Sequence, residues 1–195
     1  MKYRWDIINR FIAEYNYKSY LEIGVRSKTC YKRINIEHKA CVDPARETNP
    51  TFCLTSENFF KQNKSTFDII FIDGLHLCEQ VERDILNSLD FLNNEGTIIC
   101  HDMNPINEAH QIRQYNGGTW NGDVWKAWVK LRSKRSDLSM YVVDTDHGIG
   151  VIRKGKQDVI NELPERLTYK DLVNHRKQYL NLITLEEFIN SSLVT

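Results

Sequence analysis

The stretch FDIIFIDGLHLCEQVERDILNSLDFLNNEGTIICHDMNP, residues 67–105, decides the fold of this chain. It begins with an apolar run rich in Ile and Phe, which is typical of a buried parallel strand. From Leu77 to Leu92 apolar residues recur at helical spacing with charged residues between them, which predicts an amphipathic helix. A turn is expected at residues 93–96, and a second buried strand then ends at His101 and Asp102. The stretch therefore predicts a strand–helix–strand unit of a parallel sheet.

Acidic and imidazole side chains follow both strands of this unit. Asp73 ends the first strand and His76 lies three residues later, while His101 and Asp102 end the second. In open parallel sheets, ligands bind outside the carboxyl ends of the strands. We therefore expect these four side chains to face one crevice and to form a site there.

Length and composition indicate a globular protein with one substantial core. The chain has 195 residues, of which 41% are hydrophobic. Lys plus Arg equals Asp plus Glu at 26 each, so the overall charge gives no reason to expect nucleic acid or an anionic membrane as a partner. Five cysteines without CxxC spacing are typical of reduced thiols, and there is no apolar run long enough for a signal peptide or a membrane span. These features predict a cytoplasmic protein that binds neither nucleic acid nor membrane.

The amino-terminal part predicts the first half of a nucleotide-binding fold. Residues 4–15 have helical periodicity and are expected to cover one edge of the sheet. Residues 18–25 form a predicted strand that carries Glu22 and Gly24 near its end, and a helix is expected to follow. The glycine lets a ligand approach the backbone, and the helix supplies free N–H groups. The dinucleotide pattern GxGxxG is absent, which disfavours a diphosphate site.

A second predicted strand, residues 39–42, ends at Asp43, about 20 residues after the glycine. A carboxylate at this place accepts hydrogen bonds from both hydroxyls of a ribose, which indicates a ligand that contains adenosine. Ordinary turn chemistry at a strand end is the alternative for Glu22, Gly24 and Asp43. Residues 49–55 predict a third strand, and Ser56 is expected to cap a short helix after it.

The remainder of the chain predicts a substrate loop, a closing hairpin and a helical tail. Residues 104–121 are rich in Asn and Gly, and such a long loop beyond the predicted site indicates a substrate lid. A helix at 123–133 and an antiparallel pair of strands, 139–144 and 148–153, are expected to follow. We expect a domain at 1–155 and a helical extension at 156–195, which packs either on the domain or on a second subunit in a homo-oligomer.

In this order and at this spacing, the motifs resemble the class I S-adenosylmethionine-dependent methyltransferases. More narrowly, they resemble a small family that includes metal-dependent sugar and macrolide O-methyltransferases. The quoted matches are LEIG (21–24), VDP (42–44), LTSENFF (54–60), FDIIFIDGLH (67–76) and ICHDMNP (99–105). The resemblance covers residues 18–153 and implies an α/β, Rossmann-like, doubly wound and mostly parallel seven-stranded sheet with an antiparallel closing hairpin.

The resemblance also implies roles for individual residues. S-adenosylmethionine would be bound by Glu22, Gly24, Asp43, Ser56 and Asp73, with the segment around Ser56 on the adenine. His76 would be the catalytic base, and its ordinary pKa suits proton abstraction near neutrality; capping or filling the turn is its alternative role.

A divalent cation such as Mg or Mn would be held by Asp73, Asp102 and His101. His101 stands where metal-dependent members have a carboxylate, so a metal site and a metal-free pair that orients the substrate both stay open.

We therefore predict O-methylation of a hydroxyl on a sugar, a glycan or another small molecule. Two alternatives stay open. One is a catalytically silent cofactor-binding or scaffold protein that uses its helical tail for assembly. The other is a nucleotide-sugar-modifying enzyme, which the missing glycine pattern disfavours.

Overall fold

The computed structural model describes residues 1–193, and its centre is one seven-stranded sheet of order β2-β1-β3-β4-β6-β5-β7. β6 runs antiparallel to both of its neighbours, and the other adjacent strands pair in parallel. The predicted Rossmann-like, mostly parallel sheet with a closing hairpin is confirmed. The strands are β1 (Ser19–Ile23), β2 (His38–Val42), β3 (Phe67–Ile72), β4 (Leu92–Cys100), β5 (Leu138–Asp144), β6 (Ile149–Lys154) and β7 (Leu182–Thr184).

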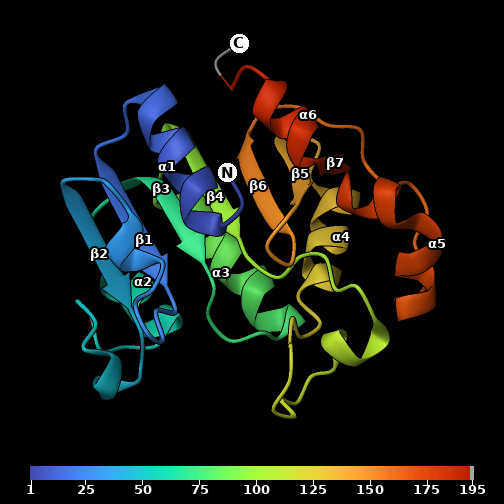
Figure 1. Ribbon diagram of the computed structural model, residues 1–195, viewed down its shortest axis with the longest axis horizontal. Coiled ribbons are helices and arrows are strands. Elements are labelled where there is room, and N and C mark those ends of the chain that lie inside the picture. Colours follow the sequence, from blue (N-terminus) through green and yellow to red (C-terminus); the bar gives the residue numbers. More distant parts are fainter. Residues whose placement is uncertain (194–195) are drawn as a thin grey trace.

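Helices cover both faces of the sheet, as a doubly wound fold requires (Figure 1). α1 and α6 lie on one face, and α2, α3, α4 and α5 lie on the other. Short 3-10 turns occur at residues 31–33, 46–48 and 108–111. The helices are α1 (Arg4–Tyr15), α2 (Ser56–Gln62), α3 (Cys78–Asp90), α4 (Trp125–Lys134), α5 (Tyr169–Leu180) and α6 (Leu185–Asn190).

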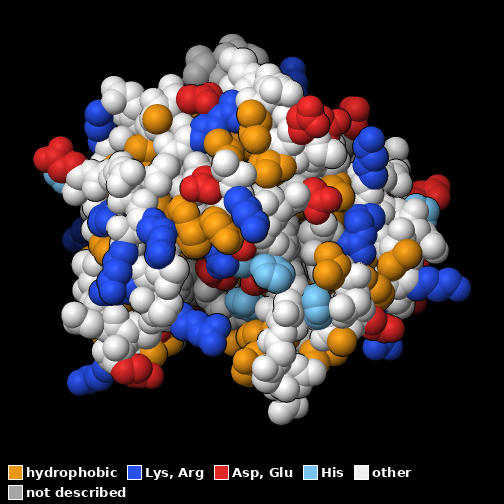
Figure 2. Space-filling view, in the orientation of Figure 1, with side chains coloured by type: hydrophobic (Ala, Val, Ile, Leu, Met, Phe, Trp, Pro, Cys, Tyr) orange, Lys and Arg blue, Asp and Glu red, His pale blue; other side chains and the backbone are white. Residues whose placement is uncertain are grey.

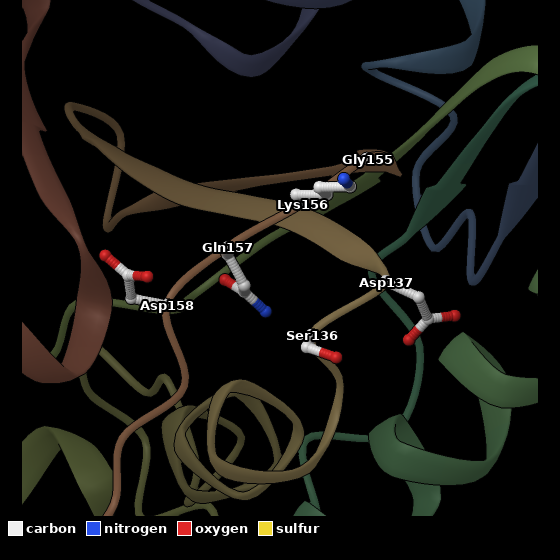
Figure 3. Close-up of a pocket in the computed structure, with 6 residues that line it drawn as sticks. All are labelled: Ser136, Asp137, Gly155, Lys156, Gln157 and Asp158. Carbon is white, nitrogen blue, oxygen red and sulfur yellow. The ribbon is translucent and has the colours of Figure 1, made fainter.

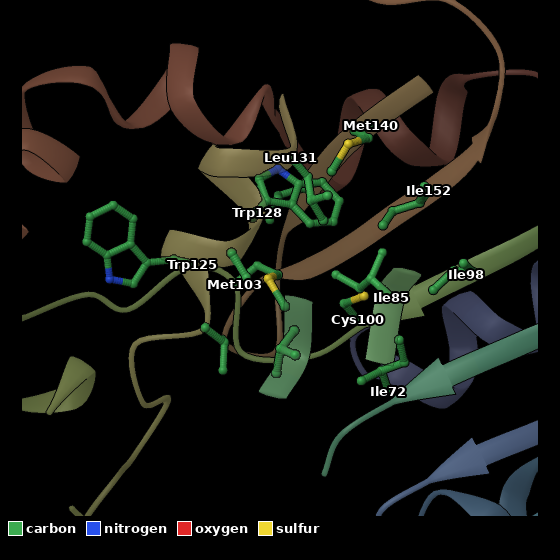
Figure 4. Close-up of a cluster of buried hydrophobic side chains, with 14 of the residues drawn as sticks. Ile72, Ile85, Ile98, Cys100, Met103, Trp125, Trp128, Leu131, Met140 and Ile152 are labelled. Atoms are coloured by element: carbon green, nitrogen blue, oxygen red, sulfur yellow. The ribbon is translucent and has the colours of Figure 1, made fainter. Parts of the chain in front are cut away.

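The larger core lies between the sheet and helices α3 and α4 (Figure 4). Ile72, Ile98 and Ile152 point from three neighbouring strands toward Ile85 of α3 and Trp128 of α4. Trp128 is fully buried, as its place on the apolar face of the helix predicts. This packing fixes the ends of β3 and β4 against the start of α3, where the expected site residues stand.

The second core lies under α1, which was expected to cover an edge of the sheet. α1 instead crosses the middle of one face, where Ile7, Ile8, Phe11 and Ile12 pack against side chains of β3, β4, β5 and β6 (Figure 1). Burying about four large apolar side chains favours folding by several kcal/mol. The face is therefore a better place for this helix than an edge, which offers it less apolar surface.

Three elements differ from the sequence-based expectation. Residues 49–55 form no strand and contribute one bridge, between Phe52 and Val42. The helix expected after β1 is reduced to the 3-10 turn at residues 31–33. The seventh strand is β7, which pairs in parallel with β5.

The carboxyl-terminal segment packs on the rest of the chain. Leu172 and Leu180 of α5 are buried in the larger core, and Phe188 of α6 is buried in the second, beside Phe11. The division between a domain at 1–155 and an extension at 156–195 stays a prediction, as does contact of the extension with a second subunit. Residues 194–195 lie outside the described residues. In the described part of the chain, every helix is too short or too polar to traverse a lipid bilayer.

Candidate active site

The candidate site lies at the edge of the sheet where the parallel strands β1, β2, β3 and β4 end. Because neighbouring parallel strands run in one direction, the residues that follow them meet at one edge. On the face shown in Figure 2, histidine, acidic and basic side chains gather near the centre and lie partly below the surrounding surface. This is the arrangement expected for a crevice at the carboxyl ends of the strands.

The four side chains predicted to share the crevice do come together. His101 Nδ1 lies 3.0 Å from Asp102 Oδ2 and 3.3 Å from Asp73 Oδ1. His76 Nδ1 lies 3.4 Å from Asp102 Oδ2, and His76 Nε2 lies 3.5 Å from Asp73 Oδ1. Two carboxylates and two imidazoles thus form a single cluster, built from residues after β3 and β4.

The buried charges of this cluster shift its proton affinities. Burial by itself lowers the pKa of His101, but the charges of Asp73 and Asp102 outweigh burial and raise it well above its ordinary value. Burial raises the pKa of Asp73, but His101, His76 and Arg4 outweigh it and hold the pKa well below its usual range. These shifts favour a protonated His101 beside an ionised Asp73.

Two members of the cluster, Arg4 and Asp146, were not predicted from the sequence. Arg4 Nη1 donates to Asp73 Oδ2 at 2.8 Å and lies 3.1 Å from His101 Nδ1. Arg4 Nε and its backbone N–H both donate to Asp146 Oδ2, at 3.0 Å and 2.8 Å. Asp146 belongs to the β5–β6 turn, which reaches this edge because β5 runs parallel to β4. That position in the hairpin is the signal that could have identified it.

His76 is oriented from two directions by the 104–121 loop. Its ring stacks on Trp120, with centroids 4.6 Å apart and planes 16° from parallel. Its Nδ1 lies 3.2 Å from the Trp120 carbonyl oxygen, which accepts the Nδ1 proton in one tautomer. Gly122, at φ +66°, lies so close to the His76 backbone that a Cβ there would overlap it. The loop expected to bind substrate therefore also fixes the plane of the expected base.

Left-handed backbone conformations concentrate around the cluster. Asp102 has φ +65°, and Asp146 and His147 have φ +43° and +66°. Such values are uncommon outside glycine and cost of order 1–3 kcal/mol each where they are strained, so the surrounding structure must hold them in place. Residues held in this way are frequent at ligand sites, which agrees with the position of the cluster.

Glu22 and Gly24 stand at the end of β1. Glu22 is 2% exposed, accepts a hydrogen bond from the Tyr20 hydroxyl, and burial raises its pKa to about 8. Gly24 has φ +81°, and a side chain there would overlap the backbone of Asp73 and Gly74. Glycine is therefore required at this position by the close approach of β3, whatever a ligand requires.

Asp43 ends β2 and holds the turn after β1. Its Oδ2 accepts from the N–H groups of Val25 and Arg26 at 2.9 Å and 3.2 Å, and its Oδ1 accepts from the Ala45 N–H at 2.9 Å. The side chain is buried, at 8% exposure. The turn chemistry considered as an alternative is thus present, and a carboxylate retains lone pairs for further donors. Its role in ribose binding stays a prediction.

Ser56 was expected to cap α2, but Thr55 does so by accepting from the Asn58 N–H. Ser56 Oγ instead accepts from the Gln80 side chain of α3 at 3.1 Å. Its predicted contact with the cofactor is not tested by this geometry. Ser56 therefore stays a predicted cofactor residue whose observed bond joins α2 to α3.

A divalent ion has a suitable set of donors but little free space among them. Ligand atoms of Asp73, His76 and Asp102 lie within 4.8 Å of one another, and carboxylates with imidazole suit Mn, Fe or Zn. However, Asp73 Oδ2 is bonded to Arg4, and His101 Nδ1 lies between the Asp73 and Asp102 oxygens that an ion would share. As they lie, these aspartate oxygens are already engaged by Arg4 and His101. The predicted metal set Asp73, His101 and Asp102 stays a prediction.

One surface cleft adjoins the site, and a larger one lies away from it. One, of about 390 Å³, adjoins the cluster and is lined by Lys2, Tyr3, Asn104, Ile106 and residues 144–148. The other, of about 630 Å³, is lined by residues 136–137 and 155–158, where β5 begins and β6 ends (Figure 3). The larger cleft therefore lies at the opposite edge of the sheet from the cluster, so its volume does not identify the site.

Comparison with known families agrees with this placement. Residues 28–103 match the model of a family described as "Methyltransferase domain". This part of the chain is similar to a methyltransferase domain. The matched region includes Asp43 and all of Asp73, His76, His101 and Asp102, and it begins after Glu22 and Gly24.

Solved structures share the fold of this chain at low sequence identity. An O-methyltransferase from Bacillus cereus in complex with SAH has a TM-score of 0.57 and 13% identity, over 77% of this chain and 80% of that chain. An SAH-bound methyltransferase from Podospora anserina has a TM-score of 0.61 and 14% identity, over 78% of each chain. A putative caffeoyl-CoA O-methyltransferase from Staphylococcus aureus has a TM-score of 0.60 and 16% identity, over 77% and 82%.

A curated relative, the uncharacterised protein y4gI of Sinorhizobium fredii, is 23% identical over 161 residues. These residues are 82% of this chain and 16% of that protein, so the chain spans about one sixth of the length of this relative. The resemblance to methyltransferases is confirmed, whereas the narrower resemblance to sugar and macrolide O-methyltransferases stays a prediction.

Proposed function

We propose that this protein is an S-adenosylmethionine-dependent methyltransferase that methylates a hydroxyl group of a small molecule, with sugars and glycans as the first class to test. The observation that carries the proposal is the oriented imidazole of His76 at the carboxyl edge of the sheet in a methyltransferase domain. Structures of this fold from Bacillus cereus and Podospora anserina contain SAH, the product left when S-adenosylmethionine loses its methyl group. That chemistry supports the same cofactor here.

The cofactor would lie along the ends of β1, β2 and β3. Asp43 would accept from the ribose hydroxyls with lone pairs that its backbone donors leave free, and Ser56 would lie toward the adenine. Glu22, Gly24 and Asp73 would surround the methionine part of the ligand. With this placement, the sulfonium methyl group would approach the cluster after β3 and β4.

His76 would act as the general base. With its Nδ1 proton directed to the Trp120 carbonyl or to Asp102, the lone pair of Nε2 is left to accept the hydroxyl proton. As the oxygen–methyl bond forms, the sulfur–methyl bond breaks and its electron pair stays on sulfur. The new imidazolium would lie 3.5 Å from Asp73, whose negative charge stabilises it. Positioning and proton removal are the main requirements of such a transfer.

Burial by itself lowers the pKa of His76, but the hydrogen bond to Asp73 and the charge of Asp102 outweigh burial and raise it. A raised pKa makes the neutral base less abundant at neutral pH and makes the proton transfer itself more favourable. We therefore expect turnover to rise with pH as His76 loses its proton.

Calorimetry with SAH tests the cofactor part of the proposal. Wild-type protein should bind one SAH per chain, and Asp43→Ala should bind it about 10- to 100-fold more weakly, the worth of a charge-assisted hydrogen bond. Asp90→Ala removes an exposed aspartate at the end of α3 and should bind like wild type. Absence of SAH binding by the folded wild-type protein would contradict the proposal.

A panel of hydroxyl acceptors, read out by release of SAH from S-adenosylmethionine, tests the reaction. Turnover with at least one sugar or other small hydroxyl compound is expected. Tight SAH binding with no turnover across the panel would favour the silent cofactor-binding alternative.

A further inference from the structure

Arg4 occupies an unusual position for an arginine near the start of a chain. It is the first residue of α1, and its side chain is 23% exposed. The buried face of α1, with Ile7 and Ile8 both 0% exposed, fixes this end of the helix on the sheet. The guanidinium is therefore delivered to the cluster by a packed helix and is not a loose surface charge.

The guanidinium uses its donors on both sides of the crevice. Nη1 donates to Asp73 Oδ2 at 2.8 Å, while Nε donates to Asp146 Oδ2 at 3.0 Å. The backbone N–H of Arg4 adds a second donor to Asp146, at 2.8 Å. Planar, permanently charged guanidinium groups are well suited to such paired carboxylate contacts. Arg4 thus joins the end of β3 to the β5–β6 turn.

The same nitrogen lies against two residues of the predicted metal set. Nη1 is within 3.1 Å of His101 Nδ1 as well as within 2.8 Å of Asp73, and both residues belong to the predicted metal set. An ion bound at about 2.0–2.2 Å from both ligands would be in contact with this nitrogen. Guanidinium does not lose its proton, so an ion could bind only if Arg4 moved away.

His101 fills the remaining space. Its Nδ1 lies 3.0 Å from Asp102 Oδ2 and 3.3 Å from Asp73 Oδ1, the two oxygens that an ion between these aspartates would use. Its Nε2 faces Asp146 Oδ1 at 3.7 Å and makes no hydrogen bond with any residue that the structure describes. Both oxygen atoms of Asp73 are thus engaged by groups of the chain itself.

We propose that Arg4 is the resident cation of this site, and that with His101 it takes the place of a divalent ion, so that the reaction of the proposed methyltransferase needs no metal. Arg4 is then a positioning residue: it balances the negative charge of the Asp73 carboxylate and holds this side chain toward His76. The statement that turnover needs no metal rests on the proposed function. The prediction that the wild-type site binds no metal ion does not.

Binding of Mn²⁺, followed by the electron paramagnetic resonance signal of the free ion, tests the proposal without any acceptor. Wild-type protein should bind no stoichiometric Mn²⁺ below about 1 mM. Arg4→Ala should gain one site, at least 10-fold tighter than any wild-type binding, and the double variant Arg4→Ala/Asp73→Asn should lose it again. Arg4→Lys keeps a cation and should behave like wild type.

Arg10→Ala is the matched control because Arg10 is on the same helix but donates to Phe188 and Ser191 carbonyls, away from the cluster. It should gain no Mn²⁺ site. Thermal unfolding establishes that each variant is folded. If Arg4→Ala does not fold, wild type and Arg4→Lys still decide the matter, since a micromolar, one-per-chain Mn²⁺ site in either would overturn the proposal.

Turnover in EDTA provides the second readout. Wild-type turnover should be unchanged by EDTA, and loss of turnover that one added ion restores would overturn the proposal. Failure of SAH to bind would instead contradict the proposed function. The Mn²⁺ experiment would still test whether Arg4 excludes a metal ion. Equal Mn²⁺ affinity of wild type and folded Arg4→Ala would also overturn the role given to Arg4.

Discussion

The ends of β1 and β2 differ from the ends of β3 and β4 in how their acidic side chains are satisfied. In the first pair, Asp43 accepts from three backbone N–H groups, and Glu22 accepts from a neighbouring tyrosine hydroxyl. In the second pair, Asp73 and Asp102 face imidazole and guanidinium groups. Neutral donors hold the first pair, whereas charged and titratable groups hold the second.

This difference indicates a division of labour at one sheet edge. Backbone N–H donors cannot move a proton, so Asp43 after β2 can shape a turn and bind a ligand without an acid–base partner, whereas Glu22 after β1, with a pKa raised to about 8, can still ionise. Imidazole can accept and release a proton near neutral pH, so the groups after β3 and β4 can take part in acid–base chemistry. Substitutions in the two regions should therefore have different consequences.

The largest effect is expected from His76→Ala. Loss of a general base lowers turnover by about 10²- to 10⁴-fold, while the affinity for SAH should stay within about twofold of wild type because the cofactor lies along other strand ends. Turnover by SAH release and affinity by calorimetry measure the two quantities. His38→Ala, at the exposed start of β2, is the control. Unchanged turnover in His76→Ala would contradict a proton-transfer role for the residues after β3 and β4.

Glu22→Gln should make stability less sensitive to pH. Burial raises the pKa of Glu22 to about 8, so between pH 4.5 and 8 the folded state binds a proton that the unfolded state has released. Stability that this proton confers is complete below pH 4.5 and falls by up to about 1.4 kcal/mol per pH unit until pH 8.

Gln cannot ionise and keeps an acceptor for Tyr20, so the variant should match wild type near pH 5 and exceed it by about 2–4 kcal/mol near pH 9. Urea unfolding at several pH values measures this difference. A parallel pH dependence in the two proteins would show that Glu22 ionises normally in the fold.

Asp43→Ala should weaken the fold as well as the predicted ribose contact. Three backbone N–H groups, one buried and two partly buried, lose their acceptor, which lowers the free energy of unfolding by about 1–3 kcal/mol. Asp43→Asn retains one acceptor oxygen and should lie between wild type and Asp43→Ala. Urea unfolding without cofactor isolates this effect, and a wild-type midpoint in Asp43→Ala would mean that the turn after β1 does not depend on the carboxylate.

The smallest effect is expected from Trp120→Ala. Stacking between aromatic rings contributes about 0.5–1.5 kcal/mol, so kcat/KM should fall about 2- to 10-fold as His76 loses its fixed plane. Trp120→Phe retains a ring and should recover part of the loss. Tyr115→Ala removes an exposed ring that packs on Trp120, with centroids 5.7 Å apart, and should therefore lose less than Trp120→Ala. Equal kinetics of Trp120→Ala and wild type would show that stacking does not position the base.

The sequence predicted the cluster after β3 and β4 because one geometric rule suffices: parallel strands that are neighbours bring their ends to one edge. This rule alone predicts that four side chains lie together: Asp73, His76, His101 and Asp102. Arg4 could not be found in this way, since its contact with Asp146 spans 142 residues and depends on where α1 docks. The docking of an amphipathic helix follows from the shape of the apolar surface it covers, which no local pattern specifies.

The strands show the same limit. Residues 49–55 have strand-like composition but make one bridge, whereas β7, which lies within a helical tail, forms a strand. Pairing energy comes from the neighbouring strand and from burial of the faces, so local propensity alone did not distinguish these two short segments. The total of seven strands was right, although one of the segments was not.

The placement of β7 also bears on how much of the sheet edge is left open to another chain. β5 would otherwise present a row of unpaired N–H and C=O groups along the margin of the sheet, which is a template for pairing with another chain. Three residues of β7 cover Val142, Val143 and Asp144, and a margin this short offers little to a foreign strand. The tail thereby covers part of the sheet edge, and chains shortened before Leu182 should aggregate through β5.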